Sequence, residues 1–480
     1  MFAFAALKLA VTLPFAGQYG YHRDELYYLA SGRHPALGYV DYPPISPLLA
    51  RLDTMVFGTG LVTLRLLPIL AGCAIVILTA MIARELGGGG TAQVMSAFCI
   101  LVSGIYLGGD WIFETVAFDQ LMWALTIYVL VRLLRRGELK LWCLLGLVFG
   151  IGLETKYTIL ALGLAVTIGL VATRMRSQLK TPWPWVGFAI AIILLAPNLV
   201  WQVEHGWPSI SYLFTHHGRI AQETSRVSFV LEQLLFVNIF LLPLVVAGQR
   251  QLMRDHSLRL LAFIAPVVEL LFLVAGGKSY YATPMFVLLY AAGAVAMEPL
   301  MNRGNRFVRR AVVWVPATLL IIVLLPIALP VLPADIMART KLYDTRTDYG
   351  NMVGWPQFTR IVARVYDRLP LQERRRTRIL VGNYGEAGAI DLYGPRYHLP
   401  PALSGHLTYY YWKPRHVVVR ALIMVEVDPA SLGGQCRQVR RVATITNSLH
   451  VENEEYGNPV LLCTGRIDLD RVWKRQLHYD

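Results

Sequence analysis

The chain has 480 residues, of which 55% are hydrophobic and only 16% are charged, and its mean hydropathy is +0.47. Soluble domains carry about 25% charged residues, so this composition excludes an ordinary water-soluble protein. The net charge of +14 would suit a nucleic-acid-binding protein, but its distribution along the chain indicates membrane topology instead, and no nucleic-acid partner is expected.

Apolar segments close to the length that spans a ~30 Å hydrocarbon core recur through the first two thirds of the chain. We predict eleven transmembrane helices, at residues 1–17, 61–83, 92–108, 118–134, 141–155, 157–173, 184–202, 228–247, 259–276, 284–300 and 311–333. The first segment is short, contains Lys8 and lacks a small-residue cleavage pattern. We therefore interpret it as an anchor and not as a removed signal peptide.

The cations in the loops predict the orientation. With the N-terminus inside, the inner loops carry fifteen: Arg84, Arg132, Arg135, Arg136, Lys140, Arg174, Arg176, Lys180, Arg250, Arg254, Arg259, Arg303, Arg306, Arg309 and Arg310. The outer loops carry six: Arg23, Arg33, Arg51, Arg219, Arg226 and Lys278. Because cytoplasmic loops are enriched in Lys and Arg, this bias predicts that the loops after the odd-numbered spans, and the C-terminal tail, lie outside.

The composition changes after Pro333, where charges become frequent and long apolar runs end. We predict two domains, a transmembrane domain at residues 1–333 and an extracytoplasmic α/β domain at residues 334–480. Predicted strands are Arg378–Gly382, His416–Val427, Arg441–Ile445 and Pro459–Cys463, because these runs are rich in β-branched residues. Residues 356–369 and 467–476 are predicted to form amphipathic helices.

The five cysteines fall into two groups. Cys73, Cys99 and Cys143 lie inside apolar segments and are typical of small core residues. Cys436 and Cys463 both lie in the predicted outer domain. An oxidising compartment would allow them to form a disulfide, and two unpaired thiols are an equal alternative from the sequence.

The first outer loop holds the densest set of polar residues. Tyr21-His-Arg-Asp24-Glu25-Leu-Tyr-Tyr28 follows the first apolar segment directly, and Tyr39-Val-Asp41-Tyr42-Pro-Pro44 comes next. Paired carboxylates at a membrane surface suit proton transfer, a metal or a lipid headgroup. The alternative is a solvated helix end whose charges only mark the interface.

Other costly polar residues lie at the outer ends of predicted spans, in the same layer as Asp24. They are Arg65, Asp110, Glu114, Asp119, Glu154, Lys156, Tyr157, Lys278 and Tyr281. Carboxylates in such a layer could deprotonate a nucleophile, and Lys or Arg could hold a phosphate. Snorkelling side chains or internal ion pairs are the structural alternative for each residue.

These motifs together resemble the dolichyl-phosphate-mannose protein mannosyltransferase-like membrane glycosyltransferases, which are related to aminoarabinose lipid A transferases and galacturonosyltransferases. The resemblance rests on the two first-loop motifs, Phe118-Asp119-Gln-Leu121, Thr155-Lys156-Tyr157, and two strings in the outer domain, Gly382–Asp391 and Leu399–His406. It covers nearly the whole chain. The family resemblance implies a polytopic α-helical GT-C fold and transfer of a sugar from a polyprenyl phosphate.

The resemblance also implies residue roles. Asp24 would be the catalytic base, and Asp119 matches the acidic residue that opens the fourth span in this family. We add Glu25, the neighbour of Asp24, as a third candidate catalytic residue. Lys156 would face the lipid phosphate, and Lys278 with Tyr281 would lie near it. The other candidate substrate-binding residues are Asp41, Tyr42, Arg65 and Tyr157. Asp41 falls where aminoarabinose transferases place an acidic residue before Lys-Pro-Pro, and Tyr42 takes the place of that lysine.

We therefore predict an inverting glycosyltransferase whose partners are the bilayer, a polyprenyl-phosphate-linked sugar and a protein, lipid or glycan acceptor. A flippase for lipid-linked sugars is the main alternative, and a polytopic scaffold is the third. The sequence contains no broken inverted repeat of the kind that indicates a transporter. It predicts no organic cofactor and leaves a divalent metal open, with Asp41 and His205, His216 or His217 as candidate ligands.

Overall fold

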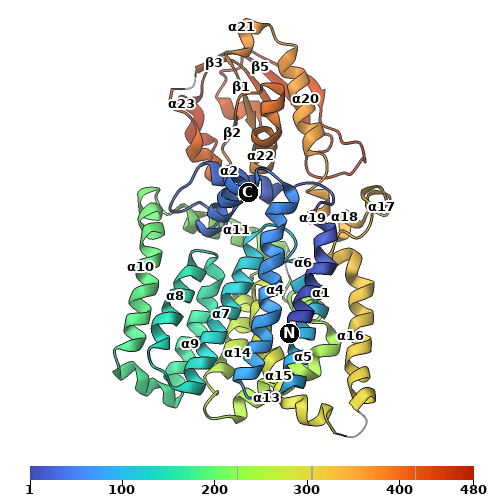
Figure 1. Cartoon of the computed structure of the whole chain (residues 1–480). Helices are drawn as coiled ribbons and strands as arrows, with labels where there is room; N and C mark the ends of the chain where they lie inside the picture. The colour runs from blue at the N-terminus through green and yellow to red at the C-terminus, as the bar shows by residue number, and fades with distance from the viewer. Residues whose placement is uncertain (224, 304–305, 417, 480) are drawn as a thin grey trace. The chain divides into compact units, whose positions relative to one another are not determined.

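The computed structural model describes residues 1–223, 225–303, 306–416 and 418–479 (Figure 1). These residues form two compact units. The first comprises Met1–Ala16, Tyr42–Ser46 and Arg65–Leu329, and the second comprises Gly17–Asp41, Pro47–Leu64 and Pro330–Asp480. The predicted division was 1–333 and 334–480, so the structure differs by placing most of the first loop with the C-terminal unit.

The first unit is built from helices. Their bounds are α1 (Phe2–Thr12), α4 (Leu61–Glu85), α5 (Gly90–Val102), α6 (Gly104–Gly108), α7 (Thr115–Arg136), α8 (Leu141–Leu153), α9 (Leu160–Ala172), α10 (Trp183–Glu204), α11 (Pro208–Glu223), α12 (Arg226–Val237), α13 (Leu242–Arg254), α14 (Ile264–Ala275), α15 (Phe286–Met301) and α16 (Arg306–Ala328). All eleven predicted segments fall on these helices or on the short 3₁₀ turns that join them. A helix satisfies its own backbone hydrogen bonds, as a lipid environment requires.

Fewer helices meet the length and composition expected of a membrane span than the sequence predicted. Among the described residues, four helices are long and apolar enough to cross a membrane: Leu61–Glu85, Thr115–Arg136, Trp183–Glu204 and Ser279–Met301. Two bent pairs, at Tyr157–Lys180 and Arg226–Arg254, raise the number to six if each pair is one span. The other predicted segments form apolar helices of 10–17 residues. The structure thus agrees with a multi-pass helical protein, while the number eleven remains a prediction.

Breaks and close packing in this unit have local causes. The break between α12 and α13 lies at Asn238, whose φ is +69° and whose side-chain amide donates to the carbonyls of Val102 and Ala317, each at 2.9 Å. Helices α8 and α10 approach closely because Gly146 faces Gly187, where a Cβ on Gly146 would lie 2.0 Å from the Gly187 carbonyl oxygen. Small residues allow such backbone approach in membrane bundles.

The second unit contains a mixed five-stranded sheet with the strand order β2-β1-β3-β5-β4. The strands are β1 (Thr377–Val381), β2 (Ala402–Ser404), β3 (Val418–Val425), β4 (Gln438–Thr444) and β5 (Pro459–Asp468). Strand β1 pairs in parallel with β2 and β3, whereas β5 runs antiparallel to β3 and β4. Parallel strands are normally covered on both faces, and the five consecutive buried residues Ala421–Val425 of β3 agree with this.

Helices complete the second unit. Their bounds are α2 (Arg23–Arg33), α3 (Ile45–Phe57), α17 (Ala334–Arg339), α18 (Leu342–Thr345), α19 (Thr347–Gly350), α20 (Trp355–Asp367), α21 (Leu371–Arg374), α22 (Tyr384–Tyr393) and α23 (Leu469–Val472). Helix α22 connects β1 to β2 and packs against both α2 and α20. The first-loop helix α2 therefore rests on a helix of the C-terminal sheet, which explains why the first loop belongs to this unit.

Most predicted elements of the C-terminal region are present, but one predicted helix is shorter and several short elements were not predicted. The helix predicted at 467–476 is reduced to α23 and one 3₁₀ turn, because β5 continues to Asp468 to pair with β3. The prediction also missed α22 and β2, which are formed by the strings Gly382–Asp391 and Leu399–His406 that carried the family resemblance. Strand β2 has only three residues, too few for a periodic pattern.

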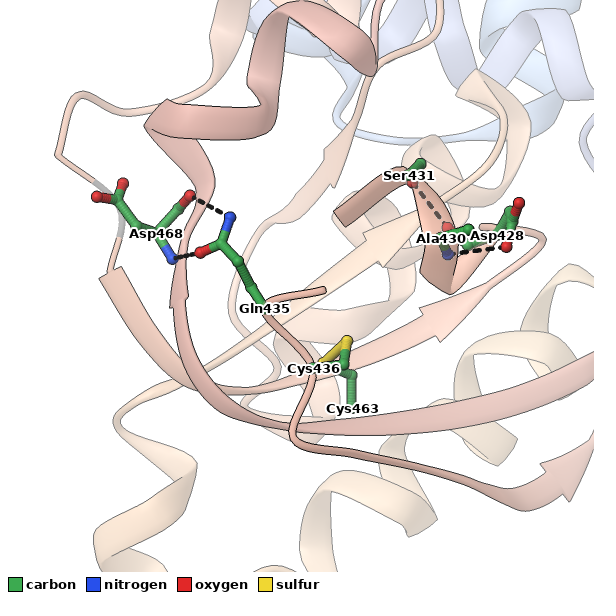
Figure 2. Close-up of a disulfide and its surroundings, with 7 residues drawn as sticks. All are labelled: Asp428, Ala430, Ser431, Gln435, Cys436, Cys463 and Asp468. Carbon is green, nitrogen blue, oxygen red and sulfur yellow. Dashed lines mark hydrogen bonds between the residues drawn. A yellow bond between two sulfur atoms is a disulfide. The ribbon is translucent and has the colours of Figure 1, made fainter. Parts of the chain in front are cut away.

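Cys436 and Cys463 form a disulfide, with a Cα–Cα distance of 5.4 Å (Figure 2). It links the segment before β4 to the middle of β5, where Cys463 is fully buried. Beside it, Gln435 exchanges two hydrogen bonds with the backbone of Asp468, accepting from its N–H at 2.6 Å and donating to its carbonyl at 3.1 Å. The pairing that the sequence left open is thus present, and Cys73, Cys99 and Cys143 are free.

Candidate functional site

The acidic pair Asp24 and Glu25 lies in the first turn of α2, where the two carboxylates have different surroundings. His22 is the N-cap, and its Nδ1 accepts a hydrogen bond from the Asp24 N–H at 3.3 Å. Glu25 completes a capping box by accepting from the His22 N–H at 2.8 Å, and its side chain is fully buried. Glu25 thus fixes the start of the helix, as a carboxylate at the third helical position commonly does.

Asp24 keeps 32% of its side chain exposed. Its Oδ1 accepts a hydrogen bond of 2.7 Å from the hydroxyl of Tyr384, the first residue of α22. Its Oδ2 lies 3.9 Å from Nδ1 of His22. Asp24 is therefore held on one oxygen by the C-terminal region and remains accessible, as a carboxylate that receives a proton from a substrate must be.

The second first-loop carboxylate, Asp41, is joined to the same group through Tyr27. The Tyr27 hydroxyl lies 3.1 Å from Asp41 Oδ1 and accepts a hydrogen bond from the Thr408 N–H at 3.0 Å, so its own proton is directed at Asp41. Burial, with a further contribution from the Asp24 charge, raises the pKa of Asp41 to about 8. The environment of Asp41 thus favours the protonated form of its carboxyl group.

Aromatic rings fill the space between these carboxylates. The Tyr27 ring stacks on Tyr384 at 4.7 Å between centroids and on Tyr409 at 6.0 Å. The guanidinium of Arg23 lies 5.3 Å from the centroid of the Tyr384 ring and pairs with Glu454. The contacts bring two first-loop carboxylates together with Tyr384 of the C-terminal region, all within the second unit. Tyr409 lies behind Tyr27 and bonds Asp391 instead.

A second group lies in the helical unit at the start of α7. The Asp119 carboxylate is buried and accepts a hydrogen bond of 2.8 Å from the Thr158 hydroxyl. The ammonium of Lys156 lies 5.2 Å from the Tyr280 ring centroid and 5.1 Å from that of Tyr281. This geometry is a cation–π arrangement. The structure thus brings predicted Lys156 and Tyr281 together and adds Tyr280 and Thr158.

Two other predicted residues of this unit have structural partners. The Tyr157 hydroxyl donates a hydrogen bond to the Asn198 side chain at 3.1 Å. Tyr157 is therefore not part of the Lys156 group, by which we mean Lys156, Tyr280 and Tyr281. Arg65 is fully buried, donates to the Ala16 carbonyl at 3.0 Å and lies 4.8 Å from the Trp111 ring centroid. Arg65 therefore connects the end of the first apolar segment to the loop before α7.

Lys8 and Asp110 form an ion pair of 2.5 Å in which both side chains are fully buried. The sequence showed Lys8 only as an unusual charge in a predicted span. Removal of either partner would leave a buried charge uncompensated, which is strongly unfavourable. This pair is therefore best explained as a structural contact between α1 and the loop before α7.

The remaining candidates are less informative. Lys278 is half-buried and precedes the 3₁₀ turn Ser279–Tyr281, while Tyr42 is buried at the start of the segment Tyr42–Ser46 in the helical unit. His205 Nδ1 lies 2.8 Å from the Trp201 carbonyl oxygen, and its ring stacks on Trp201. The side chains of His216 and His217, the other suggested partners of Asp41, lie outside the described part of the structure.

Tyr27 and Tyr384 were missed as site residues. The only available signal was that Tyr27 and Tyr384 lie inside the motifs carrying the family resemblance, next to acidic residues. Nothing in their spacing places residue 384 beside residue 24, because that contact depends on the packing of α22 against α2.

Comparisons with known proteins identify a matching family model and similar folds. Residues 41–201 match the family model of dolichyl-phosphate-mannose-protein mannosyltransferase. The crystal structures of ArnT from Cupriavidus metallidurans, bound to undecaprenyl phosphate and in the apo state, both superpose with a TM-score of 0.59, at 15% and 14% identity. In each case the match covers 96% of this chain and 97% of ArnT. No curated protein matches the chain by sequence.

The arabinofuranosyltransferase AftD from Mycobacteria is also similar, with a TM-score of 0.55 and 14% identity over 97% of this chain and 40% of AftD. Such identities establish the fold and leave substrates open. The resemblance inferred from the sequence motifs is thus confirmed, and the chain shares the helical fold of ArnT and AftD.

Proposed function

We propose that this chain, which carries the dolichyl-phosphate-mannose-protein mannosyltransferase signature over residues 41–201 and shares the fold of ArnT, transfers a sugar from a polyprenyl phosphate to an acceptor hydroxyl. The observation that carries the proposal is Asp24, an accessible carboxylate held on one oxygen at the start of a capped helix. The match to an ArnT structure bound to undecaprenyl phosphate supports a donor of that lipid class.

The reaction needs few groups. The acceptor oxygen attacks the anomeric carbon of the donor while the bond from that carbon to the phosphate oxygen breaks. The leaving polyprenyl phosphate keeps the bonding electrons, and the acceptor proton passes to Asp24. A single displacement of this kind inverts the configuration at the anomeric carbon.

We assign the phosphate to the Lys156 group. Phosphate is already a good leaving group, so the protein mainly has to stabilise its growing charge, and a fixed cation suits that task. The rings of Tyr280 and Tyr281 hold the ammonium of Lys156 in place. Asp119 supplies a buried negative charge near this cation.

Orientation completes the proposal. Fifteen cations lie in the predicted inner loops and six in the outer ones. This excess supports a location of the first loop and of residues 330–480 on the outer side of a bacterial plasma membrane. The Cys436–Cys463 disulfide is also typical of a compartment that is oxidising. Transfer would then take place on the outer face, with a protein, lipid or glycan as acceptor.

The test has two stages. Comparison of polyprenyl-phosphate sugars between a deletion strain and its parent should reveal one accumulated donor, which identifies the sugar. Enzyme purified in detergent should then transfer that sugar to an acceptor extract. Asp24→Asn should abolish transfer, while Glu25→Gln retains more activity, since the buried Glu25 carboxylate caps α2. Normal turnover by folded Asp24→Asn would remove Asp24 as the base.

A flippase is the alternative, and the detergent assay separates the two functions. In detergent there is no bilayer to cross, so formation of a covalent product requires transferase activity. Donor accumulation in cells without product formation in detergent would favour the flippase.

A further inference from the structure

Tyr384 is held more firmly than a surface tyrosine. It begins α22, whose N-cap Asn383 forms a capping box with Glu386. One face of its ring stacks on Tyr27, with 22° between the ring planes, and the Arg23 guanidinium also lies over the ring. These contacts restrict the phenol ring, so the position of its hydroxyl is restricted as well.

The backbone brings this hydroxyl to Asp24. Helices α2 and α22 pack so closely that a Cβ on Gly388 would lie 2.8 Å from Cβ of Leu26, and a Cβ on Gly385 would lie 2.9 Å from Cβ of Arg23. Only glycine fits at such distances without a shift of the helices. The two glycines therefore allow the approach at which the hydroxyl bonds Asp24 Oδ1 at 2.7 Å.

We propose that Tyr384, from the C-terminal region, is a positioning residue that donates a hydrogen bond to one oxygen of Asp24 and thereby orients the other oxygen toward the acceptor hydroxyl. The inference rests on the proposed role of Asp24 as the base. It makes the C-terminal region part of the catalytic apparatus.

The direction of the hydrogen bond supports this role. An ionised carboxylate only accepts hydrogen bonds, so the hydroxyl must be the donor. Burial and the nearby Asp24 charge raise the pKa of Tyr384 well above its ordinary value, so the hydroxyl keeps its proton at physiological pH. A hydrogen bond to a charged group is also stronger and more directional than one between neutral groups.

The matched control is Tyr409. It lies in the same unit, stacks on the same Tyr27 ring, and its hydroxyl donates to a different carboxylate, Asp391 Oδ2, at 2.9 Å. Tyr384→Phe and Tyr409→Phe therefore remove equivalent groups, but only the first removes a donor to Asp24. A general effect of losing a tyrosine hydroxyl from this unit would appear in both variants.

The test uses the full-length enzyme in detergent, with the polyprenyl-phosphate sugar that accumulates in the deletion strain as donor. Rates are divided by the fraction of chains that resist trypsin, so that loss of folded protein is corrected. Tyr384→Phe should lower kcat by about 10- to 100-fold, the usual cost of a hydrogen bond to a charged group, with little change in KM for the donor. Tyr409→Phe should stay within about threefold of the wild type.

The pH–rate profile adds a readout that a purely structural loss would not move. Removal of a donor favours the protonated form of a carboxylate, so the acidic limb should move to higher pH in Tyr384→Phe and stay in place in Tyr409→Phe. Equal kcat values and coincident acidic limbs in the two variants would overturn the inference. Normal turnover by Asp24→Asn would instead overturn the proposed function, so the two failures are distinguishable.

If Tyr384→Phe does not fold, Gly388→Ala is the second variant that tests the proposal. This change pushes α22 away from Leu26 and keeps the hydroxyl. It should lower kcat in proportion to the displacement of Tyr384 from Asp24, and a folded Gly388→Ala enzyme with wild-type kcat would contradict the proposal.

Discussion

Removal of the disulfide should destabilise the C-terminal unit by an amount that follows from its loop length. Cys436 and Cys463 are 27 residues apart in the sequence. Closing a loop of that size lowers the entropy of the unfolded chain by an amount worth about 3.5 kcal/mol at 25 °C. A domain typically has only about 5–15 kcal/mol of stability, so Cys436→Ala should raise the unfolded population by roughly 300-fold.

Pulse proteolysis of full-length protein in detergent, across a urea series, measures this population. Cys143→Ala is the matched control, because Cys143 is a free cysteine in α8 and the substitution is the same. Thiol labelling of the denatured chain should modify three cysteines before reduction and five after it. Labelling of all five without reductant, or equal stability of Cys436→Ala and Cys143→Ala, would refute this reasoning.

Three further predictions concern the cations, pH and orientation. Lys156→Ala should weaken donor binding by ~10–100-fold, and more than Lys156→Arg does, because a charged contact is lost. Lys278→Ala should act in the same direction. Unchanged donor affinity in both alanine variants would mean that these lysines only anchor helix ends. Burial raises the pKa of Glu455 to about 7, so the folded state binds a proton that the unfolded chain releases, and stability should fall as pH rises from about 4.5 to 7. Glu455→Gln should flatten that slope in urea titrations at several pH values. A reporter fused after Asp480 should be read outside the cell membrane and one within 135–140 inside, whereas a cytoplasmic C-terminus would contradict the proposed orientation.

Much of the architecture followed from the sequence because it depends on local properties of the chain. Long apolar runs have to become helices in a lipid environment, and cations at their ends indicate which side is inside. β-branched runs such as residues 418–425 predicted strands. The family resemblance followed from short motifs, and it marked Asp24 and Lys156 without any knowledge of their neighbours.

The tertiary structure decided what the carboxylates can do. Asp24 and Glu25 are adjacent and chemically similar, yet Glu25 caps α2 whereas Asp24 accepts a hydrogen bond from Tyr384. Burial raises the pKa of Asp41, an effect that no local sequence pattern reports. Contacts between residues 360 positions apart depend on how helices pack, so only the folded chain could place Tyr384 beside Asp24.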